Sequence, residues 1–313
     1  MRGVFYSLMT LLLLVPIITL AFYYSQAWPQ ATERLVSRSV GFGVENFVGS
    51  VADDFPRAVE ISGKSAAAAL VNHVVSSGEA VDDAEAKIAE LANNGYYYGS
   101  PSVLMSNNSL LAWTKRLEEK APYFGLSVIV NITNYSAVPF DAFHVLLNAT
   151  ISVNASNENY EVNFSRSYSA YKIVSIEGLE DPLYALNTRG LGHRTIKANV
   201  SSVYGVEAVD DAAFEAYYVA SSHAPCFFDR LENKKTLSAK YEAQARFNPG
   251  FESFVNTLSL SQQGVEVQDN ASVIDHYYFD LPQQYGFAVN DSGFAWLKLD
   301  AEHAVIYGVT LES

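Results

Sequence analysis

An uncharged apolar run near the N-terminus constrains this chain more than any other feature of its sequence. Residues 3–24 are interrupted only by the polar residues Ser7, Thr10 and Thr19 and carry no charge. As an α-helix, a run of this length covers roughly 33 Å, which matches the hydrocarbon core of a bilayer. We therefore predict a transmembrane anchor or leader at residues 1–27, with membrane lipid as the partner of residues 3–24.

Three interpretations of this first segment remain open. A cleaved secretory signal would be cut after Ala27, in Ser25-Gln26-Ala27, although the apolar region exceeds the usual 7–15 residues. An uncleaved signal-anchor fits the length better. Arg2-Gly3, directly before the run, resembles the prepilin-type leader of type IV pilins, which is cut after the glycine. The fifth residue after that cut is Leu8, where most major pilins have Glu, so the resemblance leaves a minor or accessory pilin-like role open.

Apolar residues continue at helical spacing after the run. Their spacing of three or four residues places them on one side of a helix: Leu35, Val36, Val40, Val44, Phe47, Val48, Val51 and Phe55. We predict a helical stalk at residues 28–95, with a bend or restart at Gly41, Gly43 or Pro56 and a separate short helix from Asp82 to about Leu91. The apolar stripe packs either on the chain's own domain or on the same stripe of another copy.

Residues 96–178 carry the clearest pattern. Apolar residues alternate with polar ones in 126–133, 143–154 and 160–168, which predicts three strands of an antiparallel meander with one buried face. A helix is predicted at 110–120. The stalk is the nearest apolar cover for the sheet, and a long N-terminal helix on an antiparallel meander is also the layout of type IV pilins.

Residues 179–313 are predicted to form a second, β-rich subdomain after a loop-like boundary at 175–192. Short strands are expected at 195–201, 214–221, 240–247, 274–279, 294–299 and 304–309, and helical turns at 224–231 and 251–255. The stretches 224–231, 251–255 and 272–279 resemble parts of uncharacterised archaeal envelope proteins with the same anchored layout, a resemblance that implies no activity. The predicted fold class is therefore α+β.

The tripeptide Asn-x-Ser/Thr, the acceptor for N-glycosylation, is enriched. Nine of the 20 asparagines begin one, whereas about three would be expected by chance. All nine follow the anchor: Asn107, Asn131, Asn134, Asn148, Asn154, Asn163, Asn199, Asn270 and Asn290. Four of them (131, 148, 154 and 163) fall on the polar phase of the predicted strands and should face solvent. The enrichment indicates an exported glycoprotein, and richness in Asn, Ser and Thr at strands and turns is the alternative explanation.

Composition and motifs exclude several functions. A net charge of −14 without basic clusters disfavours nucleic acid as a partner. The single cysteine, Cys226, forms no internal disulfide and is expected to be a buried apolar residue. His223 near Cys226 has no second ligand pair, and Asp275-His276 has no serine in a nucleophile elbow. The candidate paired carboxylates are too common to indicate glycoside cleavage: Asp229, Glu232 and Glu252. We predict no catalytic, cofactor or metal residue, and no enzyme.

These observations predict a single-pass membrane protein whose C-terminal part is extracellular. Its expected role is structural or interactive in a prokaryotic, archaeal-type cell envelope, as a pilin-like component that associates with itself or with other envelope or pilus subunits. An anchored ligand- or sugar-binding module using tyrosine-rich surfaces such as Tyr96–Tyr98 is the alternative, followed by an anchored hydrolase.

Overall fold

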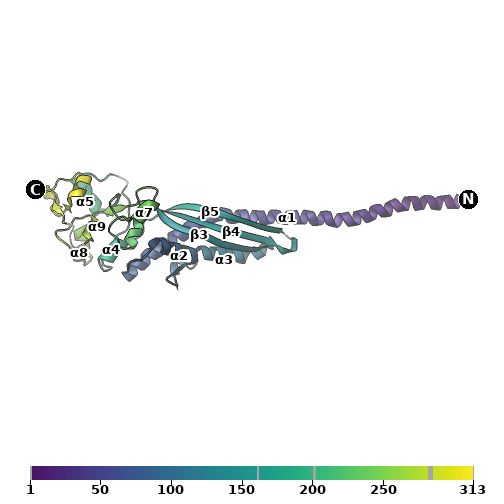
Figure 1. Ribbon diagram of the computed structural model, residues 1–313, viewed down its shortest axis with the longest axis horizontal. Coiled ribbons are helices and arrows are strands. Elements are labelled where there is room, and N and C mark those ends of the chain that lie inside the picture. The colour runs from purple at the N-terminus through teal and green to yellow at the C-terminus, as the bar shows by residue number, and fades with distance from the viewer. Residues whose placement is uncertain (1, 161, 200–201, 281–284, 313) are drawn as a thin grey trace. The chain divides into compact units, whose positions relative to one another are not determined.

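The computed structural model describes residues 2–160, 162–199, 202–280 and 285–312. Within helix and strand, the side chains of residues 2–8, 10–13, 26–35 and 158 lie outside the description. The fold is α+β, with a long N-terminal helix and antiparallel sheets, as the sequence predicts (Figure 1).

Helix α1, Arg2–Ser77, is continuous over 76 residues. It passes through Gly41, Gly43 and Pro56 without ending, so the helix does not restart at any of these residues. The helix stops where Gly78 takes a left-handed φ of 69° and its N–H bonds the carbonyl of Val74 at 2.9 Å. A glycine in this conformation is the usual end of a helix, because it carries no Cβ to strain.

Among the residues with described side chains, no helix is both long enough and apolar enough to cross a membrane. Most of the first half of the predicted anchor, residues 3–8 and 10–13, falls outside that description. In the second half the large apolar side chains are each more than half exposed: Leu14, Val15, Ile17, Ile18, Leu20 and Phe22.

The chain divides into two compact units. Unit 1 comprises residues 1–53, 117–130 and 152–167, and unit 2 comprises residues 54–116, 131–151 and 168–313. Both units draw on segments that are distant in the sequence, because helix α1 and the strands of the largest sheet each contribute residues to both.

The predicted meander is confirmed, and each of its strands is longer than expected. Strands β3 (Ser127–Asp141), β4 (His144–Asn157) and β5 (Val162–Ser175) form a three-stranded sheet in that order. A two-residue connection, Ala142-Phe143, joins the first two. The central strand alternates strictly, burying Val145, Leu147, Ala149, Ile151 and Val153. Val128 is buried as expected, whereas Val162 on the edge strand is half-buried.

Within unit 2, helix α1 approaches the central strand closely at Gly63. A Cβ on this residue would lie 2.0 Å from Leu147 Cδ1, so only glycine allows the helix backbone this near. Leu147 itself is fully buried. The apolar face of β4 is therefore covered here by the chain's own helix.

The apolar stripe of α1 is buried within a single chain. Val44, Val48 and Val51 are buried, and Phe47 is half-buried with its ring 5.8 Å from that of Phe124 in the same unit. In unit 2, Phe55 stacks on Trp113 of α3 (Leu110–Lys120), and the indole N–H of Trp113 donates to Asp54 at 2.9 Å. The stripe is not an open surface for another copy.

The short helix after α1 follows the signals in its sequence. Helix α2 (Ala84–Asn94) begins after Asp83, whose carboxylate accepts from the N–H of Ala86, and ends at the left-handed Gly95. A two-stranded hairpin follows, formed by β1 (Tyr96–Tyr97) and β2 (Ser100–Pro101). The 3₁₀ turns η1 (Val103–Met105) and η2 (Ala121–Phe124) lie before and after α3 in the sequence. A third, η3 (Glu158–Tyr160), lies between β4 and β5.

The prediction that residues 179–313 are β-rich is wrong. The described part of this segment holds seven short helices: α4 (Pro182–Asn187), α5 (Val206–Phe214), α6 (Phe227–Leu231), α7 (Ala239–Gln244), α8 (Thr257–Gln262), α9 (Asp275–Tyr278) and α10 (Ala301–Ile306). Its strands have two or three residues: β6 (Tyr218–Ala220), β7 (Phe251–Ser253), β8 (Phe287–Ala288) and β9 (Lys298–Leu299), with the 3₁₀ turn η4 (Ser292–Phe294).

Three expected strands are helices, and one expected helical turn is a strand. Helices α7, α9 and α10 occupy parts of 240–247, 274–279 and 304–309, whereas β7 forms in 251–255 and pairs antiparallel with β6. The helical turn predicted at 224–231 is confirmed by α6. Four to six residues are too few to distinguish the two periodicities, so tertiary burial decides the local structure.

The contact between Gly63 and Leu147 makes a prediction about stability. Truncating Leu147 to Ala should lower the free energy of unfolding by about 2–5 kcal/mol, because it leaves a cavity. Gly63→Ala should destabilise the wild-type protein by about 1–3 kcal/mol through overpacking. In the Leu147→Ala background the same change should instead stabilise by up to about 1 kcal/mol, since the cavity accepts the methyl group and alanine favours helix.

Urea unfolding of the four proteins measures this reversal of sign. Gly49→Ala is the matched control, because nothing lies within 4 Å of the Cβ it would add. It should be mildly stabilising in both backgrounds. An equal effect of Gly63→Ala with and without Leu147 would contradict the close approach.

Candidate functional site

A fully buried arginine organises the C-terminal part of unit 2. Arg230 on α6 places Nη1 2.6 Å from Asp181 Oδ2 and 3.0 Å from Asp275 Oδ2, and Nη2 donates to the carbonyl of Phe251. Ser253 Oγ donates to the same Asp275 oxygen at 2.7 Å. Burial raises the pKa of Asp181, and the charge of Arg230 opposes that shift. The network joins α6, β7 and α9.

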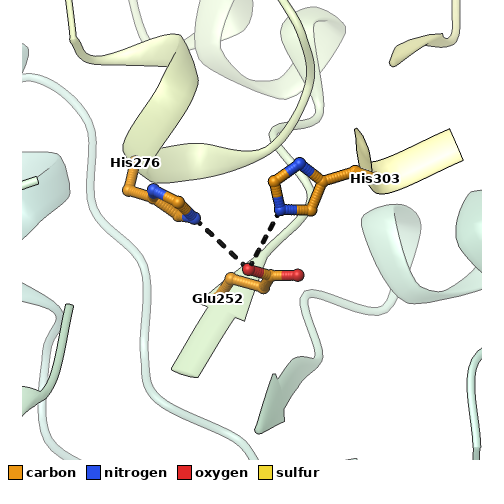
Figure 2. Close-up of side chains that lie close together, drawn as sticks. All are labelled: Glu252, His276 and His303. Carbon is orange, nitrogen blue, oxygen red and sulfur yellow. Dashed lines mark hydrogen bonds and ion pairs between the residues drawn. The ribbon is translucent and has the colours of Figure 1, made fainter. Parts of the chain in front are cut away.

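Next to this network lies a cluster of three buried residues whose side chains can bind a metal ion: Glu252, His276 and His303 (Figure 2). They come from β7, α9 and α10, and their side chains are at most 1% exposed. Glu252 Oε2 lies 3.2 Å from His276 Nε2 and 3.5 Å from His303 Nε2. One ligand atom from each residue lies within 4.8 Å of the other two.

The N-terminus of α10 sets the orientation of His303. Asp300 caps this helix by accepting the backbone N–H of His303 at 3.0 Å. The same carboxylate lies 2.8 Å from His303 Nδ1, and Ser272 Oγ donates to it at 2.8 Å. His303 Nε2 is thereby turned toward Glu252.

The pKa values of Glu252 and His303 are strongly shifted in this cluster. Burial alone would raise the pKa of Glu252, but hydrogen bonds from His276 and His303 hold it well below its usual range. Burial would lower the pKa of His303, but interactions with Asp300 and Glu252 outweigh it and raise that pKa to about 10. Tyr307 also donates its hydroxyl to Glu252 Oε1. His276 Nδ1 is buried without a hydrogen-bond partner, whereas His303 Nε2 is paired with Glu252 Oε2 at 3.5 Å.

Most glycosylation acceptors lie where a modifying enzyme would reach them. Seven are exposed: Asn107, Asn131, Asn134, Asn154, Asn163, Asn270 and Asn290. Asn148 and Asn199 are half-buried. Asn148 lies on the less buried face of β4, as its polar phase predicts, but its Oδ1 is shielded from solvent. Asn148 lies on the central strand, where neighbouring strands flank it on both sides.

The leader candidates Gly3 and Ala27 lie in stretches of α1 whose side chains are outside the described residues. Cys226 is buried, as expected, and burial raises its pKa well above the usual range, so it is not a reactive thiolate. Its Sγ donates to Asp229 at 3.1 Å.

The remaining sequence candidates do not form catalytic pairs in the structure. His223 is exposed, whereas Cys226 is buried. Asp275 accepts from Arg230 and from the backbone N–H of His276, while the ring of His276 faces Glu252. Glu232 accepts from the hydroxyl of Tyr241.

Sequence reasoning missed the Glu252–His276–His303 cluster. Glu252 and His276 are 24 residues apart, and His303 lies 27 residues further on, so no short motif links them. The one local signal is Asp300 three residues before His303, which marks a helix start and an oriented imidazole. Only the tertiary fold reveals the third partner.

A hollow of about 610 Å³ lies beside the tyrosines that the sequence singled out. Tyr97 and Tyr98 line it, and Lys87 Nζ sits 3.8 Å from the ring centroid of Tyr98. Tyr98 has a φ of 45°, a left-handed conformation that is uncommon outside glycine, and its hydroxyl donates to Asp82 at 2.5 Å. This hollow is where the alternative of a binding module would hold a ligand.

No protein-family model matches the chain, and no curated protein or solved structure matches it significantly. Any function must therefore be inferred from the geometry of the chain's own residues and from the pattern of its sequence.

The Arg230 network makes a second prediction about stability. Arg230→Ala should lower the free energy of unfolding by about 3–5 kcal/mol, because Asp181 and Asp275 would remain buried without their cation. Arg230→Lys should recover only part of this loss, since a single ammonium group lacks the planar set of donors that reaches three acceptors.

The control is Lys64→Ala, which removes an ion pair with Glu60 in which both side chains are exposed. It should cost less than about 1 kcal/mol. Denaturant unfolding compares the three variants, and a loss in Arg230→Ala as small as that in Lys64→Ala would contradict a stabilising role for the buried arginine.

Proposed function

We propose that this protein is a single-pass, membrane-anchored envelope protein whose folded part lies outside the cell and has a structural or interactive role. The observation that carries the proposal is the contrast along helix α1. Apolar side chains in residues 14–22 are exposed, whereas Val44, Val48, Val51 and Phe55 are buried by the chain itself. A continuous exposed apolar surface marks contact with lipid or with a partner.

The same contrast supports a pilin-like arrangement over association through the stalk. Because Val44, Val48 and Val51 are buried within the chain, the exposed apolar side chains of residues 14–22 are the part of α1 that we assign to lipid or to other subunits. Type IV pilins combine such a helix with an antiparallel sheet, and Leu8 in place of Glu is compatible with an accessory subunit. The exposed acceptor asparagines support export and N-glycosylation of the folded part.

The mature N-terminus tests the anchor. We expect intact mass spectrometry of the native protein to find either the full chain or a terminus at Val4, because both keep the apolar run. Gly3→Trp should leave the precursor uncut if a prepilin-type peptidase acts. Ala27→Trp is the matched control and should change nothing. A wild-type terminus at Trp28 that is lost in Ala27→Trp would overturn the proposal, since it removes the anchor.

Orientation is tested with protease added to whole cells. The folded part should be cleaved without lysis, because the proposal places it outside the membrane. Protection until the cells are lysed would show the opposite orientation.

Glycosylation makes a separate prediction at the turn between β4 and β5. Asn154→Gln should lower the mass of the native protein by one glycan, because Asn154 is an exposed acceptor. Asn159→Gln, an exposed asparagine in the same region that begins no acceptor tripeptide, should leave the glycan mass unchanged. Equal glycan mass in the wild type and Asn154→Gln would show that this acceptor is unmodified.

A further inference from the structure

We propose that Glu252, His276 and His303 bind one divalent transition-metal ion, best matched by Zn²⁺, as a structural centre of the C-terminal part. Two imidazole nitrogens and one carboxylate oxygen supply three of the four positions around a tetrahedral zinc ion, and a water molecule would take the fourth. Magnesium and calcium prefer oxygen ligands, so this set selects against them.

Two of the three separations between the ligand atoms match the edges of a tetrahedral site, and the third is at most 4.8 Å. With metal–ligand bonds of about 2.0–2.1 Å, the edge between two ligands of a tetrahedron is about 3.4 Å. The two nitrogen–oxygen separations from Glu252 Oε2 are 3.2 Å and 3.5 Å. Figure 2 shows both imidazole rings directed at this same oxygen.

A second observation points to a ligand at this place. His303 Nε2 is fully buried and directed at Glu252 Oε2, but the 3.5 Å separation between these two atoms is long for a hydrogen bond. Its other nitrogen is held by Asp300, which in turn accepts from Ser272. A carboxylate that fixes the distal nitrogen of an imidazole is the usual outer partner of a metal-bound histidine.

The other carboxylate oxygen of the cluster is also held. Tyr307 donates its hydroxyl to Glu252 Oε1, which leaves Oε2 as the atom directed at the two imidazoles. The three ligands are thus positioned before any ion binds. A proton shared between an imidazole and Glu252 would compete with the metal ion for these ligand atoms.

Burial assigns a structural role to the ion. Glu252 and His303 are fully buried and His276 nearly so, which leaves a substrate no route to a bound metal without opening the fold. The ligands lie on β7, α9 and α10, and these two helices have six residues or fewer. One ion bound to all three elements would link parts of the chain that are 24 and 27 residues apart in the sequence, and binding to the folded state alone stabilises it.

The experiment uses the full chain purified in detergent. Mass spectrometry of the metal content should find about one zinc per chain after ZnCl₂ exposure and desalting. The chelator-treated protein should unfold at a lower temperature and recover with ZnCl₂ but not with MgCl₂. Co²⁺ should give the visible absorption of a four-coordinate site in the wild-type protein, a readout that requires no variant.

Variants then assign the site. His303→Gln should lose the bound zinc, whereas His193→Gln, which removes an exposed histidine paired with Glu180, should retain it. Asp300→Asn should weaken zinc binding by roughly 10- to 100-fold, because it releases the orientation of the imidazole. A wild-type chain that neither retains zinc nor responds to ZnCl₂ would overturn the proposal, as would zinc retained in His303→Gln or equal stabilisation by MgCl₂.

Discussion

The need to cover one side of helix α1 is the constraint on which the rest of the structure depends. From Val44 onward the helix presents an apolar stripe that no isolated helix could leave in water, and burial of that stripe requires other parts of the chain. At Gly63 the cover comes so close that only a residue without a side chain fits against Leu147. The strict alternation of β4 follows from the same requirement, because a shift of one residue would turn Leu147 to solvent.

Sequence reasoning succeeded where periodicity was sustained and its ends were marked. The alternation in β4 extends over 14 residues, and the start and stop of α2 are given by Asp83 and Gly95, so local physics determines both elements. It failed in the C-terminal part, where helices α9 and α10 have four and six residues. Segments of that length satisfy strand and helix patterns alike, and contacts made elsewhere in the chain select between them.

The buried polar clusters escaped prediction for a related reason. A sequence read for function is searched for ligands at short, fixed spacing, and Glu252, His276 and His303 have none. Asp275 and His276 are adjacent in the sequence, but their side chains contact different partners: Arg230 for the aspartate and Glu252 for the histidine. These partners depend on how β7 and α9 meet, which the sequence around the pair does not determine.

The meeting of β7 and α9 also explains how two charged clusters coexist in one small core. Successive strand residues point to opposite sides, so Glu252 faces the histidines while Ser253 donates to Asp275 on the side of Arg230. On α9 the adjacent residues Asp275 and His276 divide in the same way, since Asp275 contacts Arg230 and His276 contacts Glu252. Each charge is thereby buried against an opposite charge, which is the condition under which burial is tolerated. Asp275 accepts the backbone N–H of His276 with Oδ1 and a hydrogen bond from Arg230 with Oδ2, so the arginine network supports the geometry of the histidine cluster through this shared residue.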